Sequence, residues 1–185
     1  MREKTLIGLT GKSGSGKSTA ADYLWSTAGF LEMAFADRLK ETASVLFGWD
    51  RLALNDQEYK AEACPVWGVT RREALQKLGT EAVRGVFGDD FWIKAWRQVY
   101  DQVQGIDNVV VSDVRFPNEA DAIRSMGGVI VHIVRPGVET VGVPGHVSES
   151  GVEVMPDDYV IMNSGSVEQL HEELNGLLEY LGERE

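Results

Sequence analysis

The chain has 185 residues, of which 43% are hydrophobic and 25% charged, a composition typical of a globular protein with one domain over residues 1–185. Its net charge of -11 excludes a protein that coats DNA or RNA with a basic surface, so we expect no polymer nucleic acid as partner. A lone cysteine, no signal-peptide layout and no apolar run of roughly 20 residues predict a cytoplasmic protein that contacts no membrane.

Strand-like and helix-like segments alternate along the first half of the chain, which predicts a parallel sheet flanked by helices. We expect strands at 5–10 and within 30–35, and helices from the following turn to about 28 and at 36–47. Residues 49–69 show no clear period and receive no prediction. The next helix begins at Thr70, where the pattern T-x-x-E is typical of a capping box. Its expected apolar stripe is Leu75, Leu78 and Ala82.

The second half continues the alternation. The pattern predicts helices at 90–104 and 117–126 and strands at 108–113, 128–134 and 159–162. Residues 136–151 are rich in glycine and proline, which predicts a mobile, lid-like loop. Ser166 and Gln169 predict a capping box for the last helix. Its expected buried face is Val167, Leu170, Leu174, Leu177 and Leu181.

The most specific motif is the run from Gly11 to Ser18, GKSGSGKS, which matches G-x-x-x-x-G-K-[ST] between a predicted strand and a predicted helix. Glycines let the backbone wrap around phosphate oxygens, and the helix N-terminus adds a favourable dipole. We expect Lys17 to bridge the β- and γ-phosphates of ATP and Ser18 to ligate Mg²⁺. The expected ATP-binding residues are Gly11, Ser13, Gly14, Ser15, Gly16, Lys17, Ser18 and Thr19.

A phosphate loop is shared by GTPases, ATPases and kinases, so further motifs decide between them. The chain contains neither the D-x-x-G switch nor the N-K-x-D clamp of a GTPase. The hydrophobic strand at 109–111 ends in Ser112-Asp113-Val114, without the Asp-Glu pair typical of ATPase motors. A kinase for a small molecule therefore remains.

The end of that strand is a candidate site, because ligands collect at the carboxyl ends of parallel strands. We expect Asp113 to hold a Mg²⁺-bound water and Arg115 to make a bidentate contact with a phosphate. The alternative is an ordinary helix-capping turn with a surface salt bridge.

The acceptor side is expected on three other segments. Asp37 and Lys40 follow the second strand, where Asp37 would orient the attacking group and Lys40 would contact a phosphate. The alternative is that Asp37 is the N-cap of a helix and Lys40 lies on the surface of that helix. Arg72 and Gln76 lie one turn apart on a polar helix face, which suits a phosphate and a base edge but is also common on exposed helices. Trp92 would stack on a base or lie in the core.

Several motifs occur together in one order: the phosphate loop, then 35–40, 72–81, 90–92, 112–119 and 161–163. Together they resemble the bacteriophage deoxynucleoside monophosphate kinases over nearly the whole chain. The part from Ser112 onward is also similar to phosphomevalonate kinases, and the general plan is similar to dephospho-coenzyme A kinases. A kinase for such a phosphorylated metabolite, or a nucleotide-binding module without an acceptor, stays open as an alternative.

The resemblance implies an α/β fold of the P-loop NTPase type, with a nucleoside-monophosphate-kinase-like five-stranded parallel sheet, flanking helices and a helical acceptor-binding insertion at about 49–105. It implies a phosphotransferase that uses ATP and Mg²⁺ to convert a deoxynucleoside monophosphate into the diphosphate, in the host cytoplasm for a phage-encoded chain. The catalytic residues would be Lys17, Asp37 and Arg115.

The acceptor site implied by the resemblance has Arg72 on the phosphate and Gln76 and Trp92 on the base. One departure concerns the lid, because 136–151 contains neither arginine nor lysine. Either Arg135 at its start supplies the missing charge, or Lys17, Arg115 and Mg²⁺ do so. Base preference, ribose tolerance and a homodimer are left open by the sequence.

Overall fold

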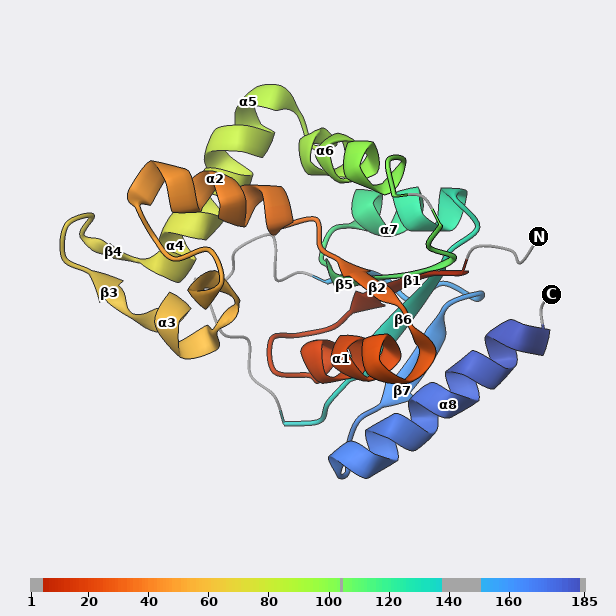
Figure 1. Ribbon diagram of the computed structural model, residues 1–185. Helices are drawn as coiled ribbons and strands as arrows, with labels where there is room; N and C mark the ends of the chain where they lie inside the picture. Colours follow the sequence, from red (N-terminus) through yellow and green to blue (C-terminus); the bar gives the residue numbers. More distant parts are fainter. Residues whose placement is uncertain (1–4, 104, 138–150, 184–185) are drawn as a thin grey trace.

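The computed structural model describes residues 5–103, 105–137 and 151–183 (Figure 1). Its centre is a five-stranded sheet in the order β2-β5-β1-β6-β7, with every neighbouring pair parallel. The strands are β1 (Thr5–Thr10), β2 (Leu31–Met33), β5 (Asn108–Val114), β6 (Val129–Val134) and β7 (Tyr159–Met162). The predicted parallel sheet is confirmed. The lid-like loop expected at 136–151 falls mainly on 138–150, which lie outside the described residues.

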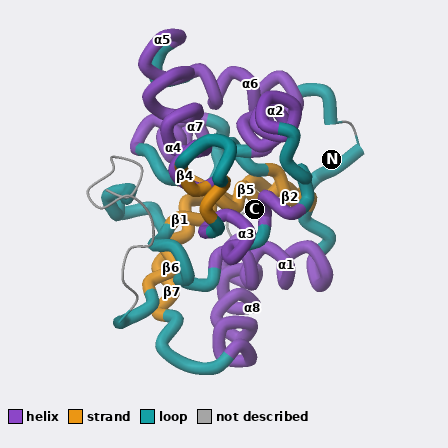
Figure 2. The backbone as a smooth tube through the Cα atoms, turned by 90° about the vertical axis from the view of Figure 1, so that its left-hand side faces the viewer, coloured by secondary structure: helices purple, strands orange, loops and turns teal. Residues whose placement is uncertain are grey.

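Helices cover both faces of the sheet, as the two views show (Figures 1 and 2). On one face, α1 (Lys17–Ala28) and α8 (Val167–Glu183) bury their apolar stripes against alternate residues of the strands. On the other face lie α6 (Phe91–Tyr100) and α7 (Pro117–Ser125), which pack on the intervening strand residues. The alternation follows from the two-residue period of a strand, because Leu6 and Ile7 point into opposite layers. No helix among the described residues is long and apolar enough to cross a membrane.

Residues 49–69, which received no prediction from the sequence, form very short helices and strands. These are η1 (Ala53–Asn55), α3 (Gln57–Ala61) and the antiparallel pair β3 (Ala63–Cys64) and β4 (Val69–Thr70). These elements join α2 (Asp37–Phe47) and α4 (Arg71–Gln76) around a third cluster of buried side chains. Elements of two to five residues are far shorter than the roughly 11 residues over which a period can be recognised, which explains why none is visible.

The capping box predicted at Ser166 is complete, whereas at Thr70 the described structure shows only the bond to the Thr70 hydroxyl, and the Glu73 carboxylate pairs with Lys77. The Thr70 hydroxyl accepts from Glu73 N at 3.1 Å, and Ser166 N donates to the Gln169 side chain at 2.9 Å. The predicted apolar stripe of α8 is wrong at one position, because the Val167 side chain lies in the first turn and is 52% exposed.

The stripe predicted for the helix after Thr70 is also wrong at its end, since Ala82 is exposed. After α4 the chain widens into the π-helix η2 (Lys77–Arg84), followed by α5 (Gly85–Phe87). A π-helix has more residues per turn than an α-helix, so the side that faces the core shifts along the chain. Arg84, and not Ala82, therefore becomes buried, with 7% of its surface exposed.

Candidate active site

The loop between β1 and α1 is closely packed on its surroundings. Gly11 and Gly16 have φ values of 146° and 108°, which favour glycine. A Cβ at Gly11 would collide with the Ile133 carbonyl, and one at Gly16 would collide with the Asn163 amide. The side chain of Asn163 also donates to Ser15 O at 2.8 Å and holds the loop from the far edge of the sheet. Asn163 appeared in the sequence only as part of a family motif, without a role of its own.

Lys17 begins α1 and bends back over this loop. Its amine donates to Gly11 O at 2.6 Å and to Lys12 O at 2.8 Å. Ser18 follows in the first exposed turn of the helix, and Thr19 is half-buried behind it. The expected ATP-binding residues are therefore gathered at one helix N-terminus, where backbone N–H groups and the helix dipole favour an anion.

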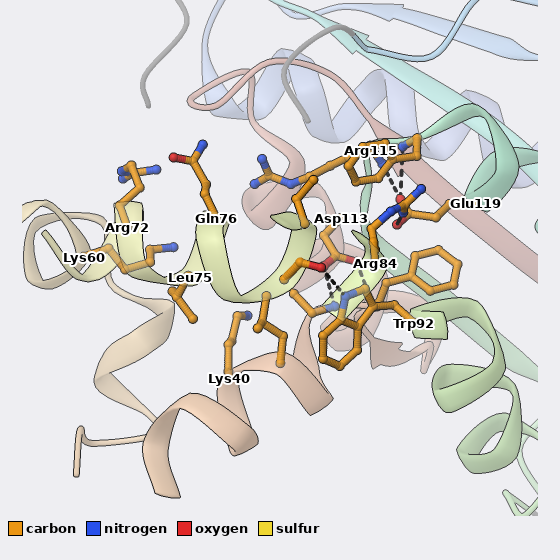
Figure 3. Close-up of a pocket in the computed structure, with 16 residues that line it drawn as sticks. Lys40, Lys60, Arg72, Leu75, Gln76, Arg84, Trp92, Asp113, Arg115 and Glu119 are labelled. Carbon is orange, nitrogen blue, oxygen red and sulfur yellow. Dashed lines mark hydrogen bonds and ion pairs between the residues drawn. The ribbon is translucent and has the colours of Figure 1, made fainter. Parts of the chain in front are cut away.

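A cavity lies between the sheet edge and the α2–α4 side of the molecule (Figure 3). Phe35, Leu39 and Leu75 supply apolar walls, and Lys40, Arg72 and Arg115 bring positive charge. Because these residues come from β5, α2 and α4, only the folded chain brings them together. Gln76 and Trp92 line the same cavity, so five of the six side chains expected on the acceptor side meet in one place.

The cations of this cavity are supported by the segment that had no predicted structure. Lys40 donates to the Asn55 side chain at 2.9 Å, and Arg72 donates to the Gln57 side chain at 2.7 Å. Both of these partners are neutral amides, and they orient the two cations at the cavity wall. Lys60 of α3 also lines the cavity and was missed in the sequence, because its helix is only five residues long.

Gln76 and Trp92 differ in how their polar atoms are used. Trp92 is 7% exposed and its indole N–H donates to Gly79 O at 2.9 Å, so the ring is fixed in the wall. The Gln76 side-chain oxygen is buried and has no hydrogen-bond partner in the described part of the chain. Such an oxygen is an acceptor that a ligand in the cavity can satisfy.

Arg84 is a cavity residue that the sequence did not single out. Its guanidinium lies over the Phe116 ring at 3.7 Å and 3.5 Å from a Glu119 carboxylate oxygen. Its Nη1 has no hydrogen-bond partner within the described ranges. The change of helical period in η2 carries this arginine into the cavity, and an α-helical stripe would have placed it elsewhere.

Two carboxylates expected to act on ligands are used to shape the backbone. Asp113 accepts from Phe35 N at 2.8 Å and from Ala36 N at 2.9 Å, which ties the end of β5 to the turn after β2. Asp37 accepts from Ala34 N at 2.9 Å and from the Arg51 guanidinium at 2.8 Å. Asp113 lines the cavity, whereas Asp37 is absent from its described lining. Ala36 occupies the N-cap position of α2, so the alternative of an Asp37 cap is wrong.

Glu119 caps α7 from inside the helix and is 4% exposed. Its carboxylate accepts from Arg115 N at 2.8 Å and from Phe116 N at 3.1 Å, so it fixes the turn that carries Arg115. Burial, followed by the nearby negative charge of Asp113, raises the pKa of Glu119 to about 7. The signal for this cap was the glutamate two residues after Pro117.

Arg115 also lines a second recess above the phosphate loop, together with Gly11, Lys12, Ser15 and Arg135. The two cavities therefore share one lining residue, Arg115. Both arginines considered as sources of compensating charge, Arg115 and Arg135, lie in this recess. Arg115 therefore joins the lining of the recess above the phosphate loop to that of the cation-lined cavity.

Comparison with known proteins gives relatives by sequence and by structure. The family model for deoxynucleotide monophosphate kinases matches residues 56–174. A mimivirus protein from Acanthamoeba polyphaga mimivirus, named provisionally for the same activity, is 35% identical over 184 residues, which cover 91% of this chain and 93% of that protein. The deoxynucleotide monophosphate kinase of Enterobacteria phage T4 is 35% identical over 117 residues, or 62% of this chain and 47% of that enzyme.

Solved structures agree on the fold. A gluconokinase from Sinorhizobium meliloti 1021 superposes with a TM-score of 0.55 at 17% identity, covering 100% of this chain and 97% of that one. The Thermus thermophilus protein TT1252 gives a TM-score of 0.55 at 21% identity, covering 97% and 99%. These similarities show the P-loop kinase fold, whereas the sequence matches show the family. This chain belongs to the deoxynucleotide monophosphate kinase family.

Proposed function

We propose that this chain transfers the γ-phosphoryl group of ATP to the phosphate of a deoxynucleoside monophosphate, giving ADP and a deoxynucleoside diphosphate. The observation that carries the proposal is the position of Arg115, which lines both the recess above the phosphate loop and the cation-lined cavity. A donor phosphate on one side and an acceptor phosphate on the other would both lie against this guanidinium. Family membership supports the same reaction.

On the donor side, the loop backbone and Lys17 would hold the β- and γ-phosphates, with Ser18 as the Mg²⁺ ligand. Asp113 already accepts two backbone N–H bonds, so its remaining lone pairs suit a metal-bound water better than the metal itself. Mg²⁺, when bound, would neutralise charge on the phosphates. The residues present fit this arrangement, in which the protein mainly positions groups and balances charge.

On the acceptor side, Lys40, Arg72 and Arg115 would hold the phosphate, while Gln76 and Trp92 would contact the base. The acceptor phosphate is ionised at neutral pH and needs no strong base to attack. We therefore propose Asp37 as a positioning residue, because both of its carboxylate oxygens are occupied by Ala34 and Arg51. It would hold the turn at the wall of the cavity without touching the acceptor.

A coupled assay of ADP release tests the proposal. The acceptors are the four common deoxynucleoside monophosphates, the four ribonucleotides, phosphomevalonate and dephospho-coenzyme A, with a sample lacking any acceptor as the baseline. We expect release above the baseline with at least one deoxynucleotide. Release only with a non-nucleotide acceptor would favour the metabolite-kinase alternative. ATP binding without release for any acceptor would favour a nucleotide-binding module.

A further inference from the structure

Lys60 is a charged residue of the cation-lined cavity, and no acidic side chain among the described residues pairs with it. It is half-buried on α3, and Figure 3 shows it beside Arg72 and Leu75 with its amine directed toward the middle of the cavity. Across 5–103, 105–137 and 151–183, no hydrogen bond or ion pair occupies this amine. A surface lysine would instead extend into water and gain solvation.

The position of α3 makes this arrangement specific. Gln57 and Lys60 are three residues apart, so they lie on the same face of the helix. Gln57 accepts from Arg72, which places that face against the cavity wall. The one acidic neighbour that acts on Lys60, Asp56, has a smaller effect than the surrounding cations. Its carboxylate is also used to cap α3 through Tyr59 N at 2.7 Å.

The surroundings of Lys60 lower its pKa. Burial is the main cause that lowers the pKa of Lys60 to about 8, followed by the charges of Lys40, Arg72 and Arg115. Asp113 and Glu119 also line the cavity, but each accepts two backbone N–H bonds. Lys40, Lys60, Arg72 and Arg115 repel one another, and an anion bound between them lowers this repulsion.

We propose that Lys60 is a ligand of the acceptor's phosphate and, together with Lys40, Arg72 and Arg115, makes the cavity select a doubly ionised phosphate monoester. The inference deepens the proposed function and rests on it. A dianion beside Lys60 supplies a counter-charge that this lysine lacks within the described residues. Because α3 belongs to the segment without predicted structure, the role of this segment would be to complete the phosphate site.

A proton is linked to this binding step. Above pH 8 the free protein carries Lys60 mainly as the neutral amine, whereas a bound dianion favours the ammonium form and raises its pKa again. The protein therefore takes up a proton when the acceptor binds, and affinity falls as the pH rises through 8. A phosphate monoester has its second pKa at about 6, so it is already doubly charged in this range and contributes no proton of its own.

Calorimetric titration of the deoxynucleotide with the highest turnover tests the proposal. Measurements at pH 7.5 and 8.5 in two buffers of different ionisation enthalpy count the protons. For the wild type we expect proton uptake at pH 8.5 and an affinity several-fold lower than at pH 7.5. Lys60→Gln should bind about tenfold more weakly at pH 7.5 and take up fewer protons at pH 8.5. The matching deoxynucleoside, which lacks the phosphate, should bind both proteins equally.

Two further variants separate charge from structure. Lys60→Arg keeps a cation that stays protonated, so it should retain affinity within about threefold and lose the change with pH. Lys94→Gln is the matched control, because Lys94 is exposed and paired with Asp90 at 2.7 Å on another helix. It should behave as the wild type in every titration.

The outcomes distinguish this inference from the function on which it rests. If no deoxynucleotide binds the wild type, the proposed function fails and the role of Lys60 fails with it. If a deoxynucleotide binds the wild type and Lys60→Gln equally well, with equal proton uptake, the role of Lys60 is wrong while the proposed function stands. If Lys60→Arg is as weak as Lys60→Gln, the lysine acts through packing and the inference is overturned.

Discussion

The two halves of the site are built in opposite ways. The phosphate loop is eight consecutive residues whose proposed ligating groups are mainly backbone N–H groups, and the Asn163 amide holds its backbone in place. The acceptor cavity takes side chains from α2, α3, α4, η2, α6 and the end of β5, which are distant in the sequence. A loop of consecutive residues can be recognised by its spacing alone, whereas a cavity of this kind depends on how the elements pack.

The difference also separates the effects that substitutions should have. In the loop, we expect most phosphate contacts to come from the backbone, so few side chains should matter and each should have a large effect. In the cavity, we expect binding to be divided among several cations and polar groups, so each replacement should remove part of the affinity. The predictions below run from the largest expected effect to the smallest and test this division.

Lys17→Ala should have the largest effect. Its amine already lies over the loop, bonded to Gly11 O and Lys12 O, and Lys17 occupies the lysine position of the motif that contacts the β- and γ-phosphates. We expect the turnover rate to fall by about 100- to 1000-fold, or roughly 3–4 kcal/mol of barrier. Circular dichroism should show an unchanged fold. A rate within about threefold of wild type would contradict the assignment of the loop as the donor site.

Arg115→Lys tests the residue that the two halves share. A lysine keeps the charge but cannot contact two phosphate groups with a planar fork. We expect kcat to fall by roughly 10- to 100-fold, equivalent to about 1.4–2.7 kcal/mol. The Michaelis constants for ATP and for the acceptor should change less than kcat, because the contact matters most during transfer. An unchanged kcat would place the transfer step away from this guanidinium.

Gln76→Leu tests the cavity alone. Its buried side-chain oxygen lacks a partner in the described structure, and leucine removes the amide while keeping most of the volume. If the amide reads the base, the acceptor KM values should change unequally, by about 1–3 kcal/mol between the most and least affected bases. The KM for ATP should stay the same. Trp92→Phe is the comparison, because it loses the bond to Gly79 O but keeps an aromatic wall and should affect all bases alike.

Glu119→Gln tests the support beneath Arg115. Burial raises the pKa of Glu119 to about 7, above the 4.5 of an ordinary glutamate, so the folded state favours the protonated form. This contribution to stability is fully present below about pH 4.5 and is lost as the pH rises through 7. From pH 5 to 7.5 the wild type should therefore lose about 1–3 kcal/mol relative to the variant. Denaturant unfolding at both pH values measures the difference, and parallel changes would contradict it.

The sequence by itself predicted the parts in which consecutive residues suffice. Hydrophobic runs and capping boxes placed the five strands of the sheet and the helix starts at Thr70 and Ser166, because these signals come from residues close together in the chain. The phosphate loop was read in the same way. Resemblance to family motifs predicted that Arg72, Gln76, Trp92 and Arg115 belong to the substrate site, and in the structure all four line one cavity.

Tertiary structure decided what depends on contacts between distant segments. Asp113 bonds backbone groups 77 and 78 residues away, and no local pattern can show that its carboxylate shapes a turn. The π-helix buried Arg84 in place of Ala82, because a wider turn changes the period on which the prediction was based. Lys60 entered the cavity on a helix too short to leave a periodic signal. Packing alone determines where such elements lie, since their own residues make too few local bonds to fix them.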